Sequence, residues 1–416
     1  MTAGMSQTRK RCSPLGKRGR LLGTIAGTAA LSVGLMGTAP FAAAADVQSK
    51  QWYLELMHAE EMWQTTTGES IKVAVIDTGV NPSTPSLKGQ VLRGLDATDA
   101  AGDETDDYDG HGTTMAELIA GTGQGGGLRG LAPGAKIIPM RVADTQFQNK
   151  NSVNAYDTAD SIRAAADGDA QIISMSFGSE FKMDREIEAV KYAQSKGKLF
   201  FAAVGNEAEK GNKPIYPAAY PEVVGVGATD RQGKASETSQ HGDFVDIAAP
   251  GDGLPFWCDE NFERYCQGNG GTSAATAITS AAAALIWSAH PEWTANQVLN
   301  VLFDTAGRGD MEKGTLSNYI GHGIIRPAVN ILKGKGTPGD PDISPLTNEK
   351  TSGSPAASES ASPQPGENDK AKDAALAGTS TEKNDGSQLN LILGGVAVVL
   401  VLGGGAFALV RRRRSA

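Results

Sequence analysis

Apolar residues in the central part of the chain gather in short runs that alternate with longer amphipathic stretches. The short runs lack the polar alternation of a half-exposed sheet, which is typical of strands buried on both faces. We predict strands over Lys72–Ile76, Lys136–Met140, Gln171–Met175, Leu199–Val204 and Val223–Val226. We predict helices over Ser161–Ala166, Met183–Ser195 and Ala274–Ala289. This alternation indicates an α/β fold in three layers, with a mostly parallel central sheet flanked by helices.

The first 45 residues have the pattern of a secretory signal peptide. A basic stretch is followed by an apolar run from Leu21 to Phe41 and then by alanines, so we expect cleavage near Ala44 or Ala45. An uncleaved signal anchor is the alternative.

The last residues have the pattern of a membrane anchor. Residues 389–410 are apolar and uncharged, and the arginines of the basic tail 411–416 follow them directly. About 20 apolar residues span a bilayer, and the arginines that follow stay on the cytoplasmic side. We therefore predict one transmembrane helix, with the rest of the mature chain facing outward. A buried core helix is disfavoured by the five glycines in this segment.

Between the ends we predict a short N-terminal extension (46–70), one folded domain (71–333) and a linker (334–388). The linker is rich in Pro, Ser, Gly and charged residues and nearly free of aromatic ones, so we expect it to be disordered and flexible. The formal net charge of -9 argues against a surface that binds nucleic acid. The expected arrangement is a folded domain tethered to a membrane.

Cysteine spacing predicts one disulfide. Cys12 leaves with the signal peptide, so Cys258 and Cys266 remain, and we expect them to pair in an oxidising compartment. The alternative, a metal pair, lacks further His or Cys at ligand spacing. An acidic stretch could hold calcium, but its spacing is not that of an EF-hand, so we expect a solvated loop and predict no metal and no cofactor. This stretch contains Asp103, Glu104, Asp106, Asp107 and Asp109.

Three short motifs suggest a catalytic site. They are Val-Ile-Asp77-Thr-Gly, Asp-Gly-His111-Gly-Thr and Gly-Gly-Thr-Ser273-Ala. A serine hydroxyl is a weak nucleophile until an imidazole takes its proton, and a buried carboxylate holds that imidazole in the correct tautomer. Alone, Asp77 would be a turn residue and Ser273 a helix N-cap. Their conjunction with His111 predicts nucleophilic catalysis.

A fourth residue, Asn206, follows the predicted strand Leu199–Val204 through a glycine. Its side-chain amide, together with the backbone N–H of Ser273, would supply the two donors that stabilise an oxyanion. An asparagine after a glycine is otherwise a turn residue.

These motifs resemble the subtilisin-like serine peptidases (family S8), and the resemblance covers about Gln51 to Lys333. The three motifs above and further blocks match in order: Ser174-Met175-Ser176-Phe177-Gly178, Val204-Gly205-Asn206 and Ala248-Ala249-Pro250-Gly251. The resemblance implies that Ser176, Phe177 and Gly178 lie along the bound substrate. It also implies that Ala203, Val204 and Gly205 border the pocket for the residue before the cut.

Within the family, the signal peptide, short N-terminal segment, linker, membrane helix and basic tail together look like the mycosins. Those are membrane-anchored actinobacterial peptidases associated with type VII secretion, and this analogy alone implies a secretion complex as partner. The segment before the first strand is too short for the folded inhibitory propeptide of secreted relatives, so we do not predict activation by its removal.

Two departures from the family pattern stand out. Glu117 occupies a position where the family has glycine, and the serine helix continues Ala274-Ala275-Thr276-Ala277-Ile278 instead of Met-Ala-Ala-Pro-His. A buried, unpaired carboxylate is destabilising. We expect that the small Ala274 leaves room for Glu117 and that a local donor satisfies it.

We therefore predict a membrane-anchored serine endopeptidase at the outer face of the cell membrane, acting on proteins or peptides. The alternative is a scaffold that keeps the fold but has little or no activity. An esterase or lipase is disfavoured because no Gly-x-Ser-x-Gly motif surrounds Ser273.

Overall fold

The structure, a computed structural model, describes most of the chain between Val47 and Thr351. The described ranges are 47–99, 101–142, 155–258, 260–268, 270–312 and 314–351. The predicted signal peptide, transmembrane helix and basic tail lie outside these residues, as does the linker beyond residue 351.

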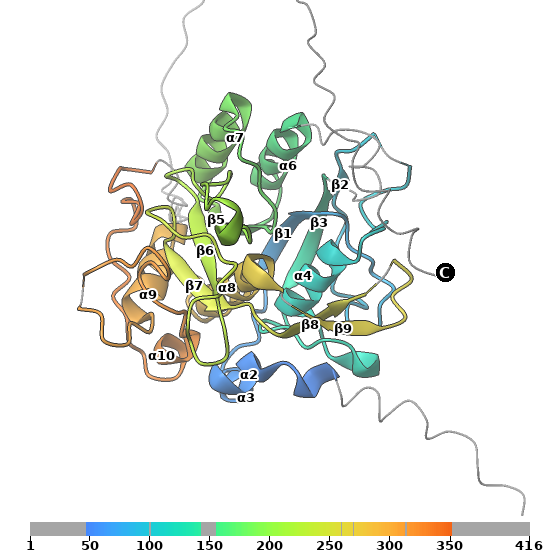
Figure 1. Cartoon of the computed structure of the whole chain (residues 1–416), viewed down its shortest axis with the longest axis horizontal. Helices are drawn as coiled ribbons and strands as arrows, with labels where there is room; N and C mark the ends of the chain where they lie inside the picture. Colours follow the sequence, from blue (N-terminus) through green and yellow to red (C-terminus); the bar gives the residue numbers. More distant parts are fainter. Residues whose placement is uncertain are drawn as a thin grey trace, which may run out of the picture. The chain divides into compact units, whose positions relative to one another are not determined.

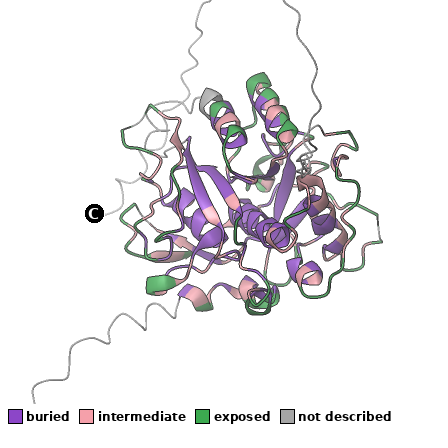
Figure 2. Ribbon diagram, turned by 180° about the vertical axis from the view of Figure 1, so that it is seen from behind, coloured by how far each residue is buried: buried purple, intermediate pink, exposed green. Residues whose placement is uncertain are grey.

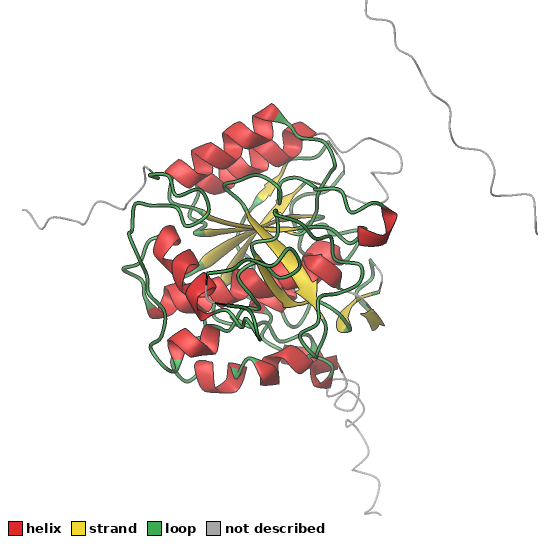
Figure 3. Cartoon of the chain, turned by 60° about the vertical axis from the view of Figure 1, so that its left-hand side comes forward, coloured by secondary structure: helices red, strands yellow, loops and turns green. Residues whose placement is uncertain are grey.

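Seven parallel strands form the central sheet, in the order β2-β3-β1-β4-β5-β6-β7 (Figures 1 and 3). All five predicted strands are present, with ends that differ by one to three residues, and the two edge strands are additional. The strands are β1 (Lys72–Asp77), β2 (Leu95–Asp96), β3 (Lys136–Arg141), β4 (Ile172–Met175), β5 (Leu199–Ala203), β6 (Val224–Thr229) and β7 (Ile247–Pro250).

Helices cover both faces of this sheet (Figure 1). Successive residues of a strand point to opposite faces, so Val73 and Val75 of β1 join one hydrophobic cluster whereas Ala74 and Ile76 join another. The first cluster includes α4 (His111–Ala120) and α8 (Gly271–Ala289), and the second includes α6 (Ala155–Asp167) and α7 (Asp184–Ser195). The predicted three-layer α/β fold is confirmed.

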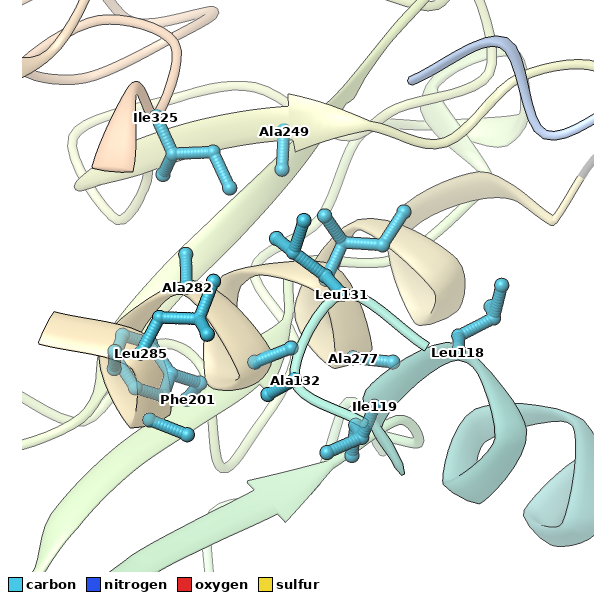
Figure 4. Close-up of a cluster of buried hydrophobic side chains, with 14 of the residues drawn as sticks. Leu118, Ile119, Leu131, Ala132, Phe201, Ala249, Ala277, Ala282, Leu285 and Ile325 are labelled. Atoms are coloured by element: carbon cyan, nitrogen blue, oxygen red, sulfur yellow. The ribbon is translucent and has the colours of Figure 1, made fainter. Parts of the chain in front are cut away.

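Helix α8 lies at the centre of the first cluster. Every residue from Gly271 to Trp287 is buried, and the helix is purple almost throughout in Figure 2. Figure 4 shows Ala277, Ala282 and Leu285 of α8 close to side chains of α4 and the sheet. In the described part of the chain, α8 is the one helix apolar and long enough to cross a membrane, but 83% of its apolar window is buried inside the protein. It is therefore a core helix.

The N-terminal extension packs against the domain. It contains α2 (Trp52–Leu56) and α3 (Ala59–Met62), and Tyr53 and Met62 are fully buried in the first cluster. The Gln51 side chain exchanges two hydrogen bonds with the backbone of Arg129, each 2.8 Å long. The extension is thus integrated with the turn that follows α4.

The folded part extends beyond Lys333, where the sequence pattern placed its end. Side chains of α9 (Ala295–Thr305), and Thr294 just before it, bind the backbone of residues 339–341. Leu346 packs against the first cluster. The expectation of a disordered linker is therefore wrong for residues 334–351, because specific hydrogen bonds to α9 hold this polar segment in place.

A two-stranded antiparallel hairpin, β8 (Leu254–Trp257) and β9 (Tyr265–Gly268), leads into α8. Cys258 and Cys266 lie across it with their sulfurs 2.12 Å apart. The remaining short elements are α10 (Pro327–Ile331) and the 3-10 helices η1 (Gln124–Gly126) and η2 (Ala208–Lys210).

Candidate active site

Asp77 and His111 form a hydrogen-bonded pair at the C-terminal edge of the sheet. Asp77 is the last residue of β1, and His111 is the first residue of α4. Asp77 Oδ1 lies 2.7 Å from His111 Nδ1, and only 3% of the Asp77 side chain is exposed. A carboxylate oxygen can only accept here, so Nδ1 carries the proton and Nε2 is left as the basic nitrogen.

The turn before α4 is built to bring these two side chains together. Gly110 has φ 83°, which favours glycine, and a methyl group on Gly112 would collide with Gly79 O. The buried carboxylate of Asp107 accepts from the backbone N–H groups of Gly110 and Thr113, at 2.9 and 2.8 Å. It therefore satisfies free donors of the first helical turn.

The acidic surroundings favour the charged form of the imidazole. Burial lowers the pKa of His111, but the negative charges of Asp77, Asp109 and Asp107 raise it, and the balance lifts the pKa from 6.5 to about 9. The positive charge that develops on an imidazole as it takes a proton is therefore stabilised at this position.

Ser273 lies in the first turn of α8, because the helix begins at Gly271 and not after the serine as predicted. Its backbone N–H is one of the donors that a first turn leaves without a partner in its own helix. Its hydroxyl donates to the carbonyl oxygen of Ser176 at 3.0 Å, and the Ser176 hydroxyl donates back to the carbonyl oxygen of Ser273 at the same distance. Ser273 is thereby fixed to the segment after β4, and its hydroxyl is bonded to Ser176 and not to His111.

Asn206 faces the start of α8 with a defined orientation. Its side-chain oxygen accepts from the backbone N–H of Thr272 at 2.9 Å and from the Thr272 hydroxyl at 3.1 Å. The same hydroxyl accepts from Gly205 N at 3.2 Å, so its proton is directed at Asn206. The amide nitrogen of Asn206 therefore points away from these donors and is available to a ligand.

The segments that the family resemblance assigns to substrate binding lie side by side. Ser176, Phe177 and Gly178 follow β4, while Ala203 ends β5 and leads into Val204 and Gly205. These strands are parallel neighbours, so both segments leave the sheet at its C-terminal edge. Ligands bind at this edge in parallel α/β folds.

Glu117 is fully buried and has two donors. The Thr84 hydroxyl donates to Oε1 at 2.8 Å, and the Tyr265 hydroxyl donates to Oε2 at 2.7 Å. The expected donors are confirmed. Burial raises the pKa of Glu117 to about 7, although both hydroxyl donors lower it.

Several supporting residues have no signal of their own in the sequence. Thr272, which orients Asn206, lies in the serine motif, and the sequence pattern predicts a role only for the serine. Asp107 was grouped with the acidic loop that we expected to be solvated, yet it is 4% exposed and bonds to the Thr78 hydroxyl at 2.8 Å. Its bonds to Gly110 and Thr113 depend on how the turn before α4 folds, which no local pattern reveals.

A buried carboxylate that orients an imidazole at the C-terminal edge of a parallel α/β sheet, in a chain whose serine motif lies in the first turn of a buried helix, is typical of serine hydrolases. The family model of the subtilases, Peptidase S8, matches residues 68–323, and the chain belongs to this family.

Curated relatives agree with this assignment. The major intracellular serine protease of Bacillus subtilis (strain 168) is 36% identical over 256 residues, which cover 59% of this chain and 78% of the relative. Mycosin-1 of Mycolicibacterium smegmatis is 32% identical over 328 residues, which cover 67% of this chain and 72% of the relative. The chain is thus a subtilisin-like serine peptidase related to the mycosins.

Solved structures give the same relation. MycP1 from Mycobacterium smegmatis has a TM-score of 0.57 at 28% identity, covering 70% of this chain and 86% of that chain. The MycP3 protease from the type VII (ESX-3) secretion system has a TM-score of 0.58 at 28% identity, and the match covers 71% of this chain and 90% of that chain.

Proposed function

We propose that the protein is a membrane-anchored serine endopeptidase that hydrolyses peptide bonds outside the cytoplasm, through Asp77, His111 and Ser273. The observation that carries this proposal is the 2.7 Å bond between the buried Asp77 and His111 Nδ1, which leaves Nε2 as the nitrogen that can act as a base. Ser273 Oγ attacks the peptide carbonyl while His111 takes its proton, which gives a tetrahedral intermediate. His111 then gives the proton to the amine, the C–N bond breaks, and an acyl-enzyme remains. Water, deprotonated by His111, attacks the acyl-enzyme, and Ser273 leaves with the proton.

Substrate binding frees the serine hydroxyl for this step. A peptide that lies extended beside Ser176–Gly178 can donate an N–H to the Ser176 carbonyl, as an added strand does. That donor competes with the Ser273 hydroxyl, which now bonds to the same carbonyl at 3.0 Å. Rotation about the Cα–Cβ bond of Ser273 then turns the hydroxyl toward His111.

The oxyanion of the tetrahedral intermediate is bound by two donors, the side-chain amide of Asn206 and the backbone N–H of Ser273. Asn206 is suited to this role because Thr272 holds its oxygen, so the amide nitrogen is oriented before substrate arrives. Such a preorganised donor is worth roughly 2.7–4 kcal/mol in the related subtilisin.

The setting of this activity rests on the sequence pattern and on the mycosin relatives. We place the domain outside the cytoplasm, anchored by the helix at 389–410 and connected to it by the linker after residue 351. The Cys258–Cys266 disulfide suits an oxidising compartment, and closing so short a loop contributes about 2–3 kcal/mol. The similarity to MycP3 from a type VII secretion system favours such a complex as the partner.

A fluorophosphonate probe tests the enzymatic proposal on the full-length protein. We expect labelling that disappears in Ser273→Ala, together with a loss of peptide turnover on the order of 10⁶, the scale of this change in subtilisin. The bond from Ser273 to Ser176 favours a second candidate, an inactive scaffold in a secretion complex. Folded wild-type protein that resists the probe would favour the scaffold.

The anchor is tested separately by cell fractionation. The full chain should sediment with membranes and be digested by protease added outside the cell, whereas a chain ending at residue 388 should be released. Recovery of the full chain in the soluble fraction would contradict the anchor but not the enzymatic activity.

A further inference from the structure

One apolar side chain reaches between the two segments that border the proposed substrate site. A methyl group added to Gly178 would collide with Ile215 Cδ1 and would lie 3.0 Å from Ile215 Cγ1. A methyl group added to Gly205 would collide with the Gln240 side chain and would also lie 3.0 Å from the same Ile215 Cδ1. The end of the Ile215 side chain therefore occupies the space between Gly178 and Gly205.

The backbone around Ile215 is held in place on both sides. Tyr216 and Ser179 exchange two backbone hydrogen bonds, at 2.7 and 2.9 Å, which attach the loop to the segment after Gly178. On the other side, the Gln240 side chain donates to the carbonyl of Lys213, and Gln240 N donates to the carbonyl of Gly205 at 2.9 Å. Isoleucine is also restricted at χ1, because it is branched at Cβ. Displacing the backbone at Ile215 would break these bonds.

The same space is the pocket for the residue before the cut, if the proposed function holds. Ser273 is bonded to Ser176, two residues before Gly178, and Asn206 directly follows Gly205. A substrate carbonyl attacked by Ser273 and held by Asn206 therefore has its side chain directed between these two glycines. The walls, Phe177-Gly178 and Val204-Gly205, carry no charge.

We propose that Ile215 limits this pocket to short, uncharged side chains, so that the enzyme cleaves after Ala, Gly or Ser and excludes aromatic, long aliphatic and basic residues. A large side chain would overlap the Ile215 methyl group in a pinned loop. A basic or acidic one would be desolvated without a partner. The inference rests on the proposed function and adds its substrate class.

The test measures how fast Ser273 of the full-length protein reacts with two peptidyl diphenyl phosphonates that differ only in the side chain before the phosphorus. One carries a methyl group, as alanine does, and the other a benzyl group, as phenylalanine does. Ser273 Oγ attacks phosphorus, phenolate leaves, and the serine proton passes to His111, so the labelling rate reports pocket fit without knowledge of the natural substrate. A small alkyl fluorophosphonate, which has no such side chain, serves as the reference.

We expect the methyl reagent to react with the wild-type protein at least about 30-fold faster than the benzyl reagent. In Ile215→Gly the benzyl reagent should gain about tenfold or more, and in Ile215→Ala less, while the methyl reagent changes by less than about threefold. Leu316→Ala, which removes an exposed aliphatic side chain from another loop, is the matched control and should leave the ratio unchanged.

The outcomes separate the two proposals. Three results would each overturn the role of Ile215 and leave the peptidase proposal standing. The first is equal reaction rates of the methyl and benzyl reagents with the wild type, and the second is a ratio of these rates that Ile215→Gly leaves unchanged. The third is no reaction with the methyl reagent while the fluorophosphonate labels Ser273. A correctly folded protein that reacts with none of the three reagents would overturn the peptidase proposal itself, and the role of Ile215 with it. The Ile215→Ala variant keeps the test informative if the glycine variant does not fold.

Discussion

The two ends of α4 each lie next to a buried carboxylate, and the two carboxylates have different partners. At the N-terminal end, Asp77 accepts from His111, which can become a cation. Toward the C-terminal end, Glu117 accepts from the neutral hydroxyls of Thr84 and Tyr265. The two buried carboxylates therefore differ in whether their partner can carry a positive charge.

The helix itself contributes to this difference. Partial positive charge gathers at the N-terminus of a helix and partial negative charge at its C-terminus. Burial raises the pKa of Glu117 to about 7, and its place in the last turn of α4, where the helix disfavours a negative charge, favours the same direction. Asp77 and His111 instead form a pair in which the imidazole pKa is raised to about 9. The N-terminal end of α4 can hold a pair of opposite charges, and the C-terminal end holds a carboxylate that takes up a proton more readily than usual.

The largest expected difference between the two ends is in turnover. Asp77→Asn keeps the shape of the side chain but removes the charge that stabilises the imidazolium and fixes its tautomer, so kcat should fall about 10⁴-fold. Glu117→Gln, the matched control at the other end, should lower kcat less than about threefold. Peptide hydrolysis by the two full-length variants, with thermal melts to confirm folding, measures both. A comparable loss in Glu117→Gln would show that the two carboxylates are not functionally distinct.

The second prediction concerns the pH dependence of activity. Imidazolium cannot take the serine proton, and the His111 pKa is raised to about 9, so kcat/KM should rise about tenfold per pH unit above neutrality and level off above about pH 9. Asp77→Asn should shift the midpoint of its residual activity to lower pH. A wild-type profile already level at pH 7 would contradict this electrostatic account.

The raised pKa of His111 makes stability change with pH in the direction opposite to activity. The folded pKa of His111 lies above its unfolded value of 6.5, so the pair contributes its full stability below about pH 6.5 and loses it as the pH rises through about 9. Activity should therefore increase over the range in which this contribution is lost. Urea unfolding of the wild type and Asp77→Asn between pH 6 and 10 measures the stability trend, which is then compared with the pH dependence of kcat/KM.

The sequence predicted the parts of the fold that depend on local patterns. Uniformly apolar runs identified the five central strands. Strand β2 has only two residues, and β7 has four and ends in proline, which is too little for a pattern. Residues 334–351 were assigned to a linker because their composition is polar, but side chains of α9 such as Asn296 bind their backbone. Composition does not reveal such specific pairing.

In the candidate site, too, the sequence predicted what local motifs carry and missed what depends on contacts between distant segments. Motifs pointed to Asp77, His111 and Ser273, and family resemblance to the segments around them. The sequence could not show that Ser273 bonds to Ser176, or that the second donor to Glu117 is Tyr265, 148 residues away. Ile215 is part of a polar loop with no pattern, and its position between two glycines depends on how that loop folds.

The third prediction concerns stability at the Glu117 end. Glu117→Ala leaves the hydroxyls of Thr84 and Tyr265 buried without an acceptor and opens a small cavity, so the free energy of unfolding should fall by about 2–3 kcal/mol. Glu117→Gln keeps an acceptor and should lose about 1 kcal/mol or less. Urea unfolding at pH 6 measures both. A large gain in stability and turnover in Glu117→Gly would instead show that the glutamate is simply unfavourable.

Glu117 should also give stability a characteristic dependence on pH. Its folded pKa of about 7 lies above its ordinary value of 4.5, so the folded protein keeps a proton that the unfolded chain releases. Its contribution should be full below about pH 4.5 and decline as the pH rises through about 7. Glu117→Gln lacks this decline, so the stability difference between wild type and variant should change over this range and be constant above it.

The smallest predicted effect isolates the link between α4 and the hairpin before α8. Tyr265→Phe removes the donor to Glu117 Oε2 and the acceptor for Leu128 N, which lies 3.3 Å from the hydroxyl, so stability should fall by about 1 kcal/mol. Tyr319→Phe, at an exposed tyrosine, is the matched control and should be neutral. A double-mutant cycle with Glu117→Gln should give a coupling of about 0.5–1 kcal/mol, because the two side chains are in direct contact.

Turnover of Tyr265→Phe should change less than twofold, since α8 is positioned mainly by its buried faces and not by the hairpin. A larger drop in kcat without a matching loss of stability would mean that Glu117 helps to place Ser273, and the two ends of α4 would then serve one function.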